Sequence, residues 1–472
     1  MVKKLSKQNI YLIGVKGVGM TMLAQFLARQ GHIISGSDIN DAFLTDQVLK
    51  KQGIKVFSPF SINNVPHKID LIVYSSAFTA ENNIELKYIN DRPEVFKNIP
   101  IKSYAACLGE VFNGYHGIAV CGSHGKTTTS AWLGYVLSKS GLDPNVLVGS
   151  RVPQFKASAL MGKSKYFVAE VDEYQNKLRY FNPYGAVLNN IEFDHPDFFK
   201  NAAAYNKVFA EFVKKIPQKG FLVANNSDAV VRKITKLCRG KVLTYDVSKE
   251  GESVPTVNYL AHNIVIRNGR LSFLVNNLGR FSIGLFGNHN IYNALAVIAA
   301  ARELRVPLEN IRKHLAGFKG TDRRAQILGR YKGAIIIDDY AHHPSEIKST
   351  LDGLRTHYPD KKIIVAFHPH TYTRTKALFD DFVGSFQKAD ELIILDIYGS
   401  AREKQGGVSS RQLVRAINRY NQTNKIKQLV RHIPDIPKVA VDLKKHLKKD
   451  DLLILMGAGD VFRVGEIILK NK

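Results

Sequence analysis

The segment GIAVCGSHGKTTTSAWLGYVLSKSG (117–141) constrains the fold more than any other part of the chain. An apolar run leads into a glycine-rich turn and then into a helical pattern, which predicts a strand, loop and helix of an α/β domain. Backbone N–H groups of such a turn bind phosphate oxygens together with the helix N-terminus. We expect Lys126 to reach a transferred phosphate and the Thr127 hydroxyl to bind Mg²⁺. Val120 stands where the longer G-x-x-x-x-G-K-T motif has glycine, so this is the shorter G-x-x-G-K-T form.

Alternating strand and helix patterns continue on both sides of this unit. The runs NIYLIGV and IDLIVYSSA precede it, and YFVAEVDE, GAVLNNIE, AIIIDDYAHHP, KKIIVAFHPHT and DLLILMGAGDV follow it. Such alternation predicts parallel sheets covered by helices. Because 472 residues are too many for one ordinary domain, we predict three α/β domains, at 1–108, 109–321 and 322–472.

The segment 241–286 has a different pattern. It consists of short strand-like runs separated by turns, and Asn268–Gly269 lies where a tight hairpin turn would be. We therefore predict a small antiparallel flap on the central domain.

Composition excludes several classes of protein. With 45% hydrophobic and 23% charged residues, the chain matches an ordinary globular protein and neither a disordered nor a collagen-like one. No apolar run approaches a membrane span, and the N-terminal sequence contains no cleavable apolar segment, so we expect a cytoplasmic protein without membrane insertion. The three cysteines, Cys107, Cys121 and Cys238, support neither a disulfide framework nor a zinc site.

The net charge of +26 attracts polyanions in general. The 67 basic residues of the chain are spread along the sequence. They form neither a basic tail nor a basic stripe interleaved with aromatic residues. We therefore expect no nucleic-acid partner.

Acidic and histidine side chains follow two further predicted strands. Glu170, Asp172 and Glu173 end one run, and Asp194 and His195 end another. The carboxyl ends of parallel strands line one crevice, so these groups could converge on bound phosphates. We select Glu170 and His195, with Thr127, as Mg²⁺ ligands, and name Lys126, Glu170 and His195 as catalytic.

Two more glycine- or asparagine-rich motifs suggest ligand contacts. In GNHNIYNAL, Asn290 and Asn293 are three residues apart on one helical face and suit paired amide hydrogen bonds to a base, with an N-cap role for Asn288 or Asn290 as the alternative. In GVKGVGM, the spacing G-x-x-G-x-G, with Asp38 following 19 residues after Gly19, suits any pyrophosphate, including that of a UDP-sugar. A simple strand–helix turn is the alternative there.

In this order, the phosphate loop, VDE, NIEFDH, GNHNIYNAL, DDYAHHPSEI, FHPHTYTRT and MGAGDV resemble the Mur ligase family over essentially the whole chain. The resemblance implies a cytoplasmic three-domain α/β enzyme: an N-terminal Rossmann-like UDP-sugar domain, a central P-loop ATPase-like domain with a parallel sheet and small antiparallel flap, and a C-terminal Rossmann-like amino-acid domain. It is most similar to the branch that joins L-alanine to the lactyl carboxylate of UDP-N-acetylmuramate in peptidoglycan synthesis. ATP and Mg²⁺ are the implied cofactors, and an acyl phosphate is the implied intermediate.

The resemblance also implies roles for individual residues. ATP contacts fall on Gly122, Ser123, His124, Gly125, Lys126, Thr127, Thr128, Asn290, Asn293, Arg323, Arg324 and Asp338, with Asp338 at the ribose. The UDP pocket falls on Gly14, Gly17, Gly19, Ser37, Asp38 and Ser75. The amino-acid pocket falls on Tyr340, His342, His370 and Arg374, with Arg374 on the carboxylate.

The chain departs from the family pattern at several positions. Lys16 stands where the UDP loop usually has glycine, Tyr174 replaces a serine, and Thr371 replaces the first arginine of H-R-Y-T-R, which leaves the amino-acid preference open. Lys200 and Lys207 do not match the spacing of a carbamylated lysine, so we infer no such modification.

Other functions remain open at this stage. Within the family these are a ligase for a recycled tripeptide and one preferring glycine or serine, whereas folylpolyglutamate synthetase lacks the first domain. An NAD-dependent oxidoreductase would leave the phosphate loop unexplained, and a nucleic-acid-stimulated ATPase would need an arginine finger that is not evident. The chain is expected to be a monomer or a weak homodimer.

Overall fold

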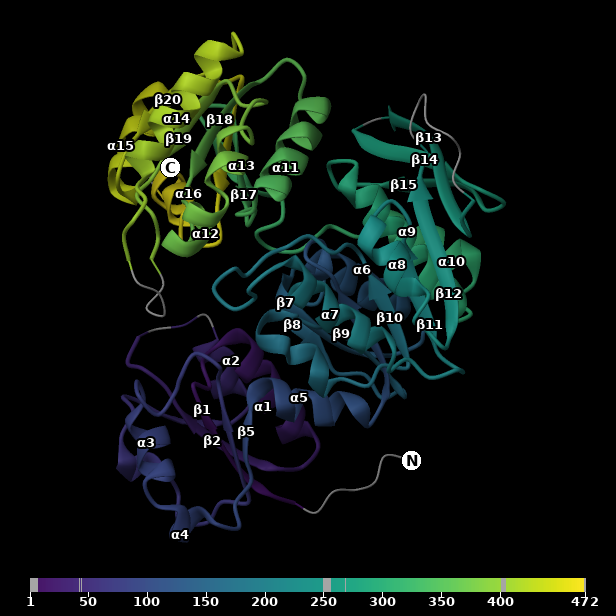
Figure 1. Cartoon of the computed structure of the whole chain (residues 1–472), viewed down its shortest axis with the longest axis vertical. Coiled ribbons are helices and arrows are strands. Elements are labelled where there is room, and N and C mark those ends of the chain that lie inside the picture. Colours follow the sequence, from purple (N-terminus) through teal and green to yellow (C-terminus); the bar gives the residue numbers. More distant parts are fainter. Residues whose placement is uncertain are drawn as a thin grey trace.

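The computed structural model describes residues 7–41, 43, 45–248, 256–267, 269–399 and 405–470. The chain forms three α/β domains, each around its own sheet, as predicted (Figure 1). The predicted boundary at 108 falls within α5 (Tyr104–Asn113), and the one at 321 falls between α10 (Leu308–Gly317) and β16 (Gln326–Tyr331). No helix in the described part of the chain is long and apolar enough to cross a membrane.

The N-terminal domain has a five-stranded parallel sheet in the order β3-β2-β1-β4-β5. Its central strand β1 is apolar and buried from Ile10 to Ile13, because helices cover both faces of the sheet. The order reverses between β1 and β4, which opens a crevice at the end of β1. The elements are β1 (Asn9–Ile13), α1 (Val18–Arg29), β2 (Ile33–Ser37), α2 (Asp46–Lys51), β3 (Lys55–Phe57), η1 (Ile62–Asn64), β4 (Leu71–Tyr74), α3 (Ile84–Asn90), α4 (Pro93–Phe96) and β5 (Ile101–Ser103).

The central domain has a ten-stranded sheet in the order β15-β14-β13-β12-β11-β10-β6-β9-β7-β8. Helices α6 and α9 pack on one face around the fully buried Trp132, and α7 and α8 cover the other face. The elements are β6 (His116–Cys121), α6 (Lys126–Lys139), β7 (Asn145–Val152), β8 (Ala157–Leu160), β9 (Tyr166–Glu170), η2 (Tyr174–Tyr180), β10 (Gly185–Leu188), α7 (Ala202–Val213), β11 (Phe221–Asn225), α8 (Ala229–Thr235), β12 (Lys241–Val247), β13 (Tyr259–Arg267), β14 (Arg270–Val275), β15 (Gly279–Ile283) and α9 (His289–Glu303).

The expectation of a small antiparallel flap over 241–286 is confirmed for β13, β14 and β15 and is wrong for β12. Strand β12 pairs parallel with both β11 and β13, whereas the pairs β13–β14 and β14–β15 are antiparallel, as is β7–β8 at the other edge of the sheet. All four strands extend the main sheet, because a strand pattern does not specify which neighbour it pairs with. Asn268 lies outside the described residues, whereas Gly269 has φ +68° and lies between the paired residues Arg267 and Arg270, as a two-residue hairpin connection requires.

The C-terminal domain has a six-stranded sheet in the order β16-β17-β21-β18-β19-β20. Only β16 runs antiparallel to its neighbour. The remaining elements are β17 (Ala334–Asp339), α11 (Pro344–His357), β18 (Lys362–Phe367), α12 (Tyr372–Ala377), α13 (Phe379–Val383), β19 (Glu391–Ile394), α14 (Ser410–Thr423), β20 (Leu429–His432), α15 (Ile436–His446), β21 (Asp451–Met456) and α16 (Phe462–Leu469).

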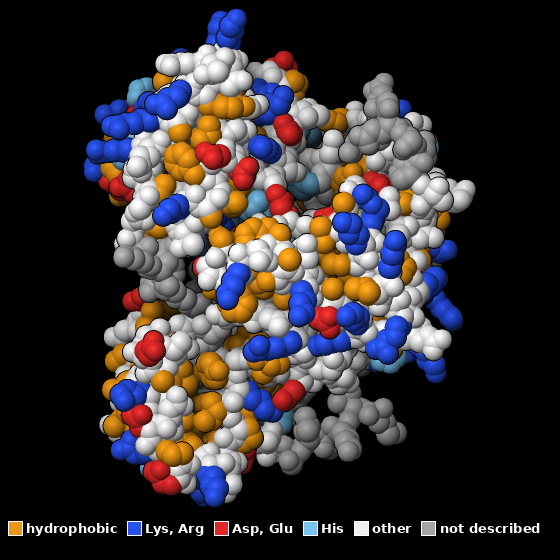
Figure 2. All heavy atoms as spheres, viewed as in Figure 1, with side chains coloured by type: hydrophobic (Ala, Val, Ile, Leu, Met, Phe, Trp, Pro, Cys, Tyr) orange, Lys and Arg blue, Asp and Glu red, His pale blue; other side chains and the backbone are white. Residues whose placement is uncertain are grey.

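The domains contact one another through different kinds of surface. Phe26 of α1 stacks on Phe167 of β9 with ring centroids 5.0 Å apart, so the N-terminal and central domains share apolar packing. The central and C-terminal domains meet through polar side chains, described below, and through Phe286, which packs on the C-terminal core beside Tyr358. Figure 2 shows Lys and Arg side chains spread over this face of all three domains and not gathered in one stripe.

Candidate active site

The phosphate loop (122–125) joins β6 to α6, as predicted. Gly122 has φ +127° and Gly125 has φ +78°, conformations that favour glycine. A Cβ at Gly122 would lie 2.8 Å from the Asn190 carbonyl oxygen, and one at Gly125 would lie 2.6 Å from Asn293 Oδ1. Both glycines are therefore needed for space as well as for backbone conformation.

Lys126 begins α6 and turns back over the loop. Its Nζ donates to the Gly122 carbonyl at 2.6 Å and the Ser123 carbonyl at 3.1 Å, and pairs with Glu173 Oε2 at 3.1 Å. Glu173 is 1% exposed and also accepts a hydrogen bond from the Tyr205 hydroxyl at 3.0 Å. Burial lowers the pKa of Lys126, but Glu173 and the nearby carboxylates outweigh burial and raise that pKa above its usual range. A fixed positive charge therefore lies at the start of α6.

The predicted metal ligands fall into two neighbouring groups. The Thr127 hydroxyl donates to Glu170 Oε1 at 2.9 Å, and the Gly149 N–H holds the other carboxylate oxygen at 2.7 Å. His195 lies instead beside Glu173, with Nε2 and Oε1 3.7 Å apart. His195, Glu173 and Asp172 each offer a ligand atom within 4.8 Å of the others. Asp172 and Glu173 were not among the predicted ligands, although their place directly after β9 was a signal for them in the sequence.

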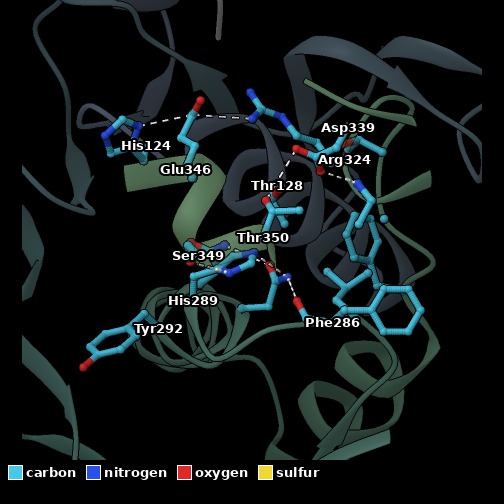
Figure 3. Close-up of a pocket in the computed structure, with 18 of the residues that line it drawn as sticks. His124, Thr128, Phe286, His289, Tyr292, Arg324, Asp339, Glu346, Ser349 and Thr350 are labelled. Atoms are coloured by element: carbon cyan, nitrogen blue, oxygen red, sulfur yellow. Dashed lines mark hydrogen bonds and ion pairs between the residues drawn. The ribbon is translucent and has the colours of Figure 1, made fainter. Parts of the chain in front are cut away.

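A cavity of about 980 Å³ lies between the central and C-terminal domains (Figure 3). Its wall includes residues at the ends of β10 and β11, where parallel strands place ligands. Of the residues predicted to contact ATP, those lining it are His124, Gly125, Thr128, Asn290, Asn293 and Arg324. The volume is sufficient for a ligand of nucleotide size, since binding pockets run to about 1,000 Å³.

The amides of Asn290 and Asn293 are already engaged within the protein. Asn293 donates to Asn290 Oδ1 at 3.0 Å and accepts from the Thr129 hydroxyl at 3.1 Å. Asn290 in turn donates to the Phe286 carbonyl at 2.5 Å. These bonds fasten α9 to α6, so contact with a base stays a prediction. Asn288 occupies the N-cap position of α9 without a side-chain cap bond.

Arg323 and Asp338 lie outside the cavity lining and pair with each other at 3.1 Å. Arg323 also donates to the carbonyls of Gly457 and Gly459, both at 2.8 Å. The adjacent residues Arg324 and Asp339 line the cavity instead. Successive side chains of a strand point to opposite faces, so a choice between neighbouring residues in DDY depends on register, which the motif does not specify. Burial raises the pKa of Asp338 to about 6, despite Arg323.

The structure brings Tyr340, His342 and His370 together in the C-terminal domain. The rings of Tyr340 and His342 are 5.2 Å apart, and those of His342 and His370 are 6.3 Å apart. Burial lowers the pKa of His342 to about 3, so its imidazole is neutral. Its Nδ1 lies 3.0 Å from the Tyr340 carbonyl, which places the proton on that nitrogen and leaves Nε2 as an acceptor.

Arg374 is 7% exposed and pairs across the domain boundary with Asp194, its Nη2 lying 3.1 Å from Oδ1. Arg374 opposes burial and lowers the pKa of Asp194 below its usual range. The predicted contact with an amino-acid carboxylate stays a prediction and requires this ion pair to be shared or exchanged. Thr371 caps α12 through its hydroxyl with φ +69°, an uncommon conformation for a β-branched residue.

The first glycine-rich loop (14–19) follows β1. Gly14 has φ +83°, and a Cβ there would lie 2.7 Å from the Phe78 ring; at Gly19 it would lie 2.8 Å from Tyr104. Gly17 is the N-cap residue of α1. Asp38 accepts from the Lys16 N–H at 2.6 Å.

The predicted serines of this loop region have partners within the protein. Ser37 is fully buried and donates to Glu85, which was not among the predicted residues, and the Ser75 hydroxyl accepts from the Ala77 N–H at 3.3 Å. Their side chains therefore shape the loop, and direct contact with a UDP-sugar stays a prediction.

Comparison with known proteins decides the family. A UDP-N-acetylmuramate–L-alanine ligase of Desulfitobacterium hafniense (strain Y51) is 37% identical over 468 residues, covering 98% of this chain and 99% of that protein. The family models described as Mur ligase family, catalytic domain; Mur ligase middle domain; and Mur ligase, glutamate ligase domain match residues 9–116, 120–301 and 323–459. This chain belongs to the Mur ligase family.

Solved Mur ligase structures share the fold. A UDP-N-acetylmuramate-alanine ligase from Thermotoga maritima has a TM-score of 0.79 at 22% identity, covering 98% of both chains. A murein peptide ligase from Psychrobacter arcticus 273-4 has a TM-score of 0.70 at 24% identity, also covering 98% of both chains. At these identities the structures establish the three-domain arrangement and do not distinguish the branches of the family.

Proposed function

We propose that this protein is an ATP-dependent ligase that joins L-alanine to the lactyl carboxylate of UDP-N-acetylmuramate in peptidoglycan synthesis. The observation that carries the proposal is the phosphate loop with its charged Lys126, beside a cavity that the C-terminal domain closes from the opposite side. Similarity to an alanine-adding ligase over 98% of the chain supports the choice of substrates.

The reaction needs activation of the carboxylate, because a carboxylate is a poor electrophile. A lactyl carboxylate oxygen attacks the γ-phosphorus of ATP, ADP leaves, and an acyl phosphate forms. The neutral amine of alanine then attacks the acyl carbon, loses a proton, and inorganic phosphate leaves. Lys126 and the N–H groups at the start of α6 offset the repulsion between the two anions, a role in which fixed charges contribute several kcal/mol.

The donor groups near Lys126 fit Mg²⁺. Hydroxyl and carboxylate oxygens are the ligands that this ion prefers, and Thr127 and Glu170 already lie within hydrogen-bond distance. His195 with Asp172 and Glu173 offers a second group of ligands. When bound, Mg²⁺ would neutralise charge on the phosphate oxygens.

The three domains then divide the substrates among them. We assign the UDP-sugar to residues 1–108, ATP to 109–321 and the amino acid to 322–472. In the last of these, His342 Nε2 would accept a hydrogen bond from the neutral amine, and Tyr340 and His370 would restrict the side chain. A cytoplasmic location and a monomeric or weakly dimeric state complete the proposal.

Phosphate release from ATP tests the proposal directly. With UDP-N-acetylmuramate present, we expect L-alanine to give the highest kcat/KM in a panel that includes glycine, serine and the tripeptide L-alanyl-γ-D-glutamyl-meso-diaminopimelate. Preference for the tripeptide would move the protein to the peptide-adding branch. Release that depends on no amino acid or peptide would contradict the ligase function.

A further inference from the structure

Helix α11 begins where the C-terminal domain faces the phosphate loop. His343 is its N-cap, and Glu346, at the third helical position, completes a capping box. Glu346 Oε2 accepts from the backbone N–H of His342 at 3.1 Å and of His343 at 3.4 Å. One carboxylate oxygen is thus used for the start of the helix, as capping boxes require.

The other oxygen of Glu346 is directed to the nucleotide cavity. Its Oε1 lies 3.2 Å from Nδ1 of His124 in the phosphate loop and 3.6 Å from Nη1 of Arg324, which lines the cavity (Figure 3). The second ring nitrogen of His124 lies 3.0 Å from Oε2 of Glu192. A single carboxylate therefore contacts the phosphate loop, a cavity-lining arginine and the backbone next to the predicted amino-acid pocket.

We propose that Glu346 is a positioning residue that docks the C-terminal domain on the phosphate loop through His124 and so aligns the amino-acid pocket with the phosphoryl group. The inference rests on the proposed ligase function and deepens it, because it assigns the alignment of two half-sites to one side chain. Alignment matters here since displacement of reacting groups by about 1 Å costs about 100-fold in rate.

Several other contacts also fasten the same domains, among them Ser345 with Glu192, and two of them illustrate how they differ from Glu346 in where they end. The Ser349 hydroxyl lies 2.8 Å from Nδ1 of His289 at the start of α9, and Arg374 pairs with Asp194. Neither reaches the phosphate loop itself, whereas His343, the N-cap of α11, contacts it through its ring, 5.0 Å from that of His124, without an ion pair. Glu346 is also 12% exposed, so little water competes for its ion pairs.

The variant Glu346→Gln separates docking from helix capping. Glutamine at this position still accepts the cap hydrogen bonds, but it removes the charge that holds His124 and Arg324. We expect kcat to fall about tenfold or more, with the Kd for UDP-N-acetylmuramate unchanged and the melting temperature close to wild type. Small-angle scattering of the ligand-free full chain should show a larger radius of gyration.

A double-mutant cycle with His124→Gln identifies the partner. If Glu346 acts through His124, the double variant loses no more than the stronger single variant, whereas independent roles give additive losses. Gln412→Ala is the matched control, because Gln412 completes the capping box of α14, remote from the cavity, and should leave kcat unchanged.

The outcomes separate this inference from the proposed function. Wild-type kcat and scattering in Glu346→Gln, or additive losses in the cycle, would overturn the positioning role. If the wild-type protein shows no ligase activity on the amino-acid panel, the proposed function fails, yet the scattering comparison still tests whether Glu346 docks the domains.

Discussion

The loop between β1 and α1 and the loop between β6 and α6 share a strand, a glycine-rich turn and a helix, but their lysines have different surroundings. Lys126 lies over its own loop beside Glu173. Lys16 turns away, and its Nζ donates to the carbonyls of Ile39 and Asp41, both at 2.9 Å. The first loop therefore directs no side-chain charge at a ligand, which suits binding, whereas the second places a cation where we propose that phosphate is transferred.

Removal of Lys126 should give the largest effect. We expect Lys126→Ala to lose ligase activity by several orders of magnitude, because the transferred phosphoryl group loses its fixed counter-charge. It should also lower the melting temperature, since the buried Glu173 is left without its cation. Lys126→Ala with Glu173→Gln should recover the melting temperature and not the activity; recovery of both would contradict the assigned role.

Replacing one glycine of each loop with alanine tests which ligand each loop binds. Gly125→Ala would place a methyl group 2.6 Å from Asn293 Oδ1, and Gly14→Ala would place one 2.7 Å from the Phe78 ring. Calorimetric titration of the full-length proteins should show about tenfold or greater loss of ATP affinity in the first variant and of UDP-N-acetylmuramate affinity in the second. Loss of the same ligand in both variants would refute the division of substrates between the loops.

The pH dependence of the phosphate loop follows from His124. Burial lowers the pKa of His124, but hydrogen bonds to Glu192 and Glu346 outweigh it and raise the pKa to about 9. His343, with its ring 5.0 Å away, and Arg324 also face this cluster. A raised pKa means that the ion pairs stabilise the docked state fully below about pH 6.5 and that this contribution is lost as the pH rises through about 9.

We therefore expect the radius of gyration of the ligand-free protein to increase between about pH 7 and pH 9.5. The control is His124→Gln, which cannot titrate and should show no such change. The same alkaline transition in that variant would assign the effect to another group.

Substitution of Lys16 should have the smallest effect of the four. Lys16→Ala removes two hydrogen bonds to the segment 39–41 but no charge directed at a ligand. We expect KM for the UDP-sugar to rise a few-fold with kcat unchanged, measured at saturating ATP and alanine. A large fall in kcat would show that the first loop also acts on the reacting groups.

The sequence was sufficient to predict those features for which the residue chemistry and the local strand and helix pattern indicate the same structure. The strand, glycine turn and helix at 117–141 predicted the phosphate loop, and the Thr127–Glu170 contact followed from the expectation that strand ends converge. Three α/β domains were likewise evident from alternating patterns, and the structure confirms them.

Other features depend on information that one sequence does not contain. The choice of Asp339 over Asp338 for the cavity depends on register, and the pairing of Arg374 with Asp194 joins residues of two domains. The parallel pairing of β12 depends on which strands become neighbours in the finished sheet. Motif spacing specifies residue types. Strand neighbours are set only when each sheet is complete, and the interdomain ion pair forms only when the domains pack together.

The stacking of Phe26 on Phe167 affects how the N-terminal domain would behave when it is expressed as a separate fragment. Met22 and Phe26 belong to the same apolar cluster as residues of the central sheet, although α1 also begins at the first glycine-rich loop. A fragment ending at residue 108 would leave this apolar stripe uncovered, so we expect it to self-associate when expressed alone. Co-expressed halves divided near residue 322 should reassemble more readily, because the surface exposed there combines the apolar Phe286 with the charged pairs His124–Glu346 and Asp194–Arg374.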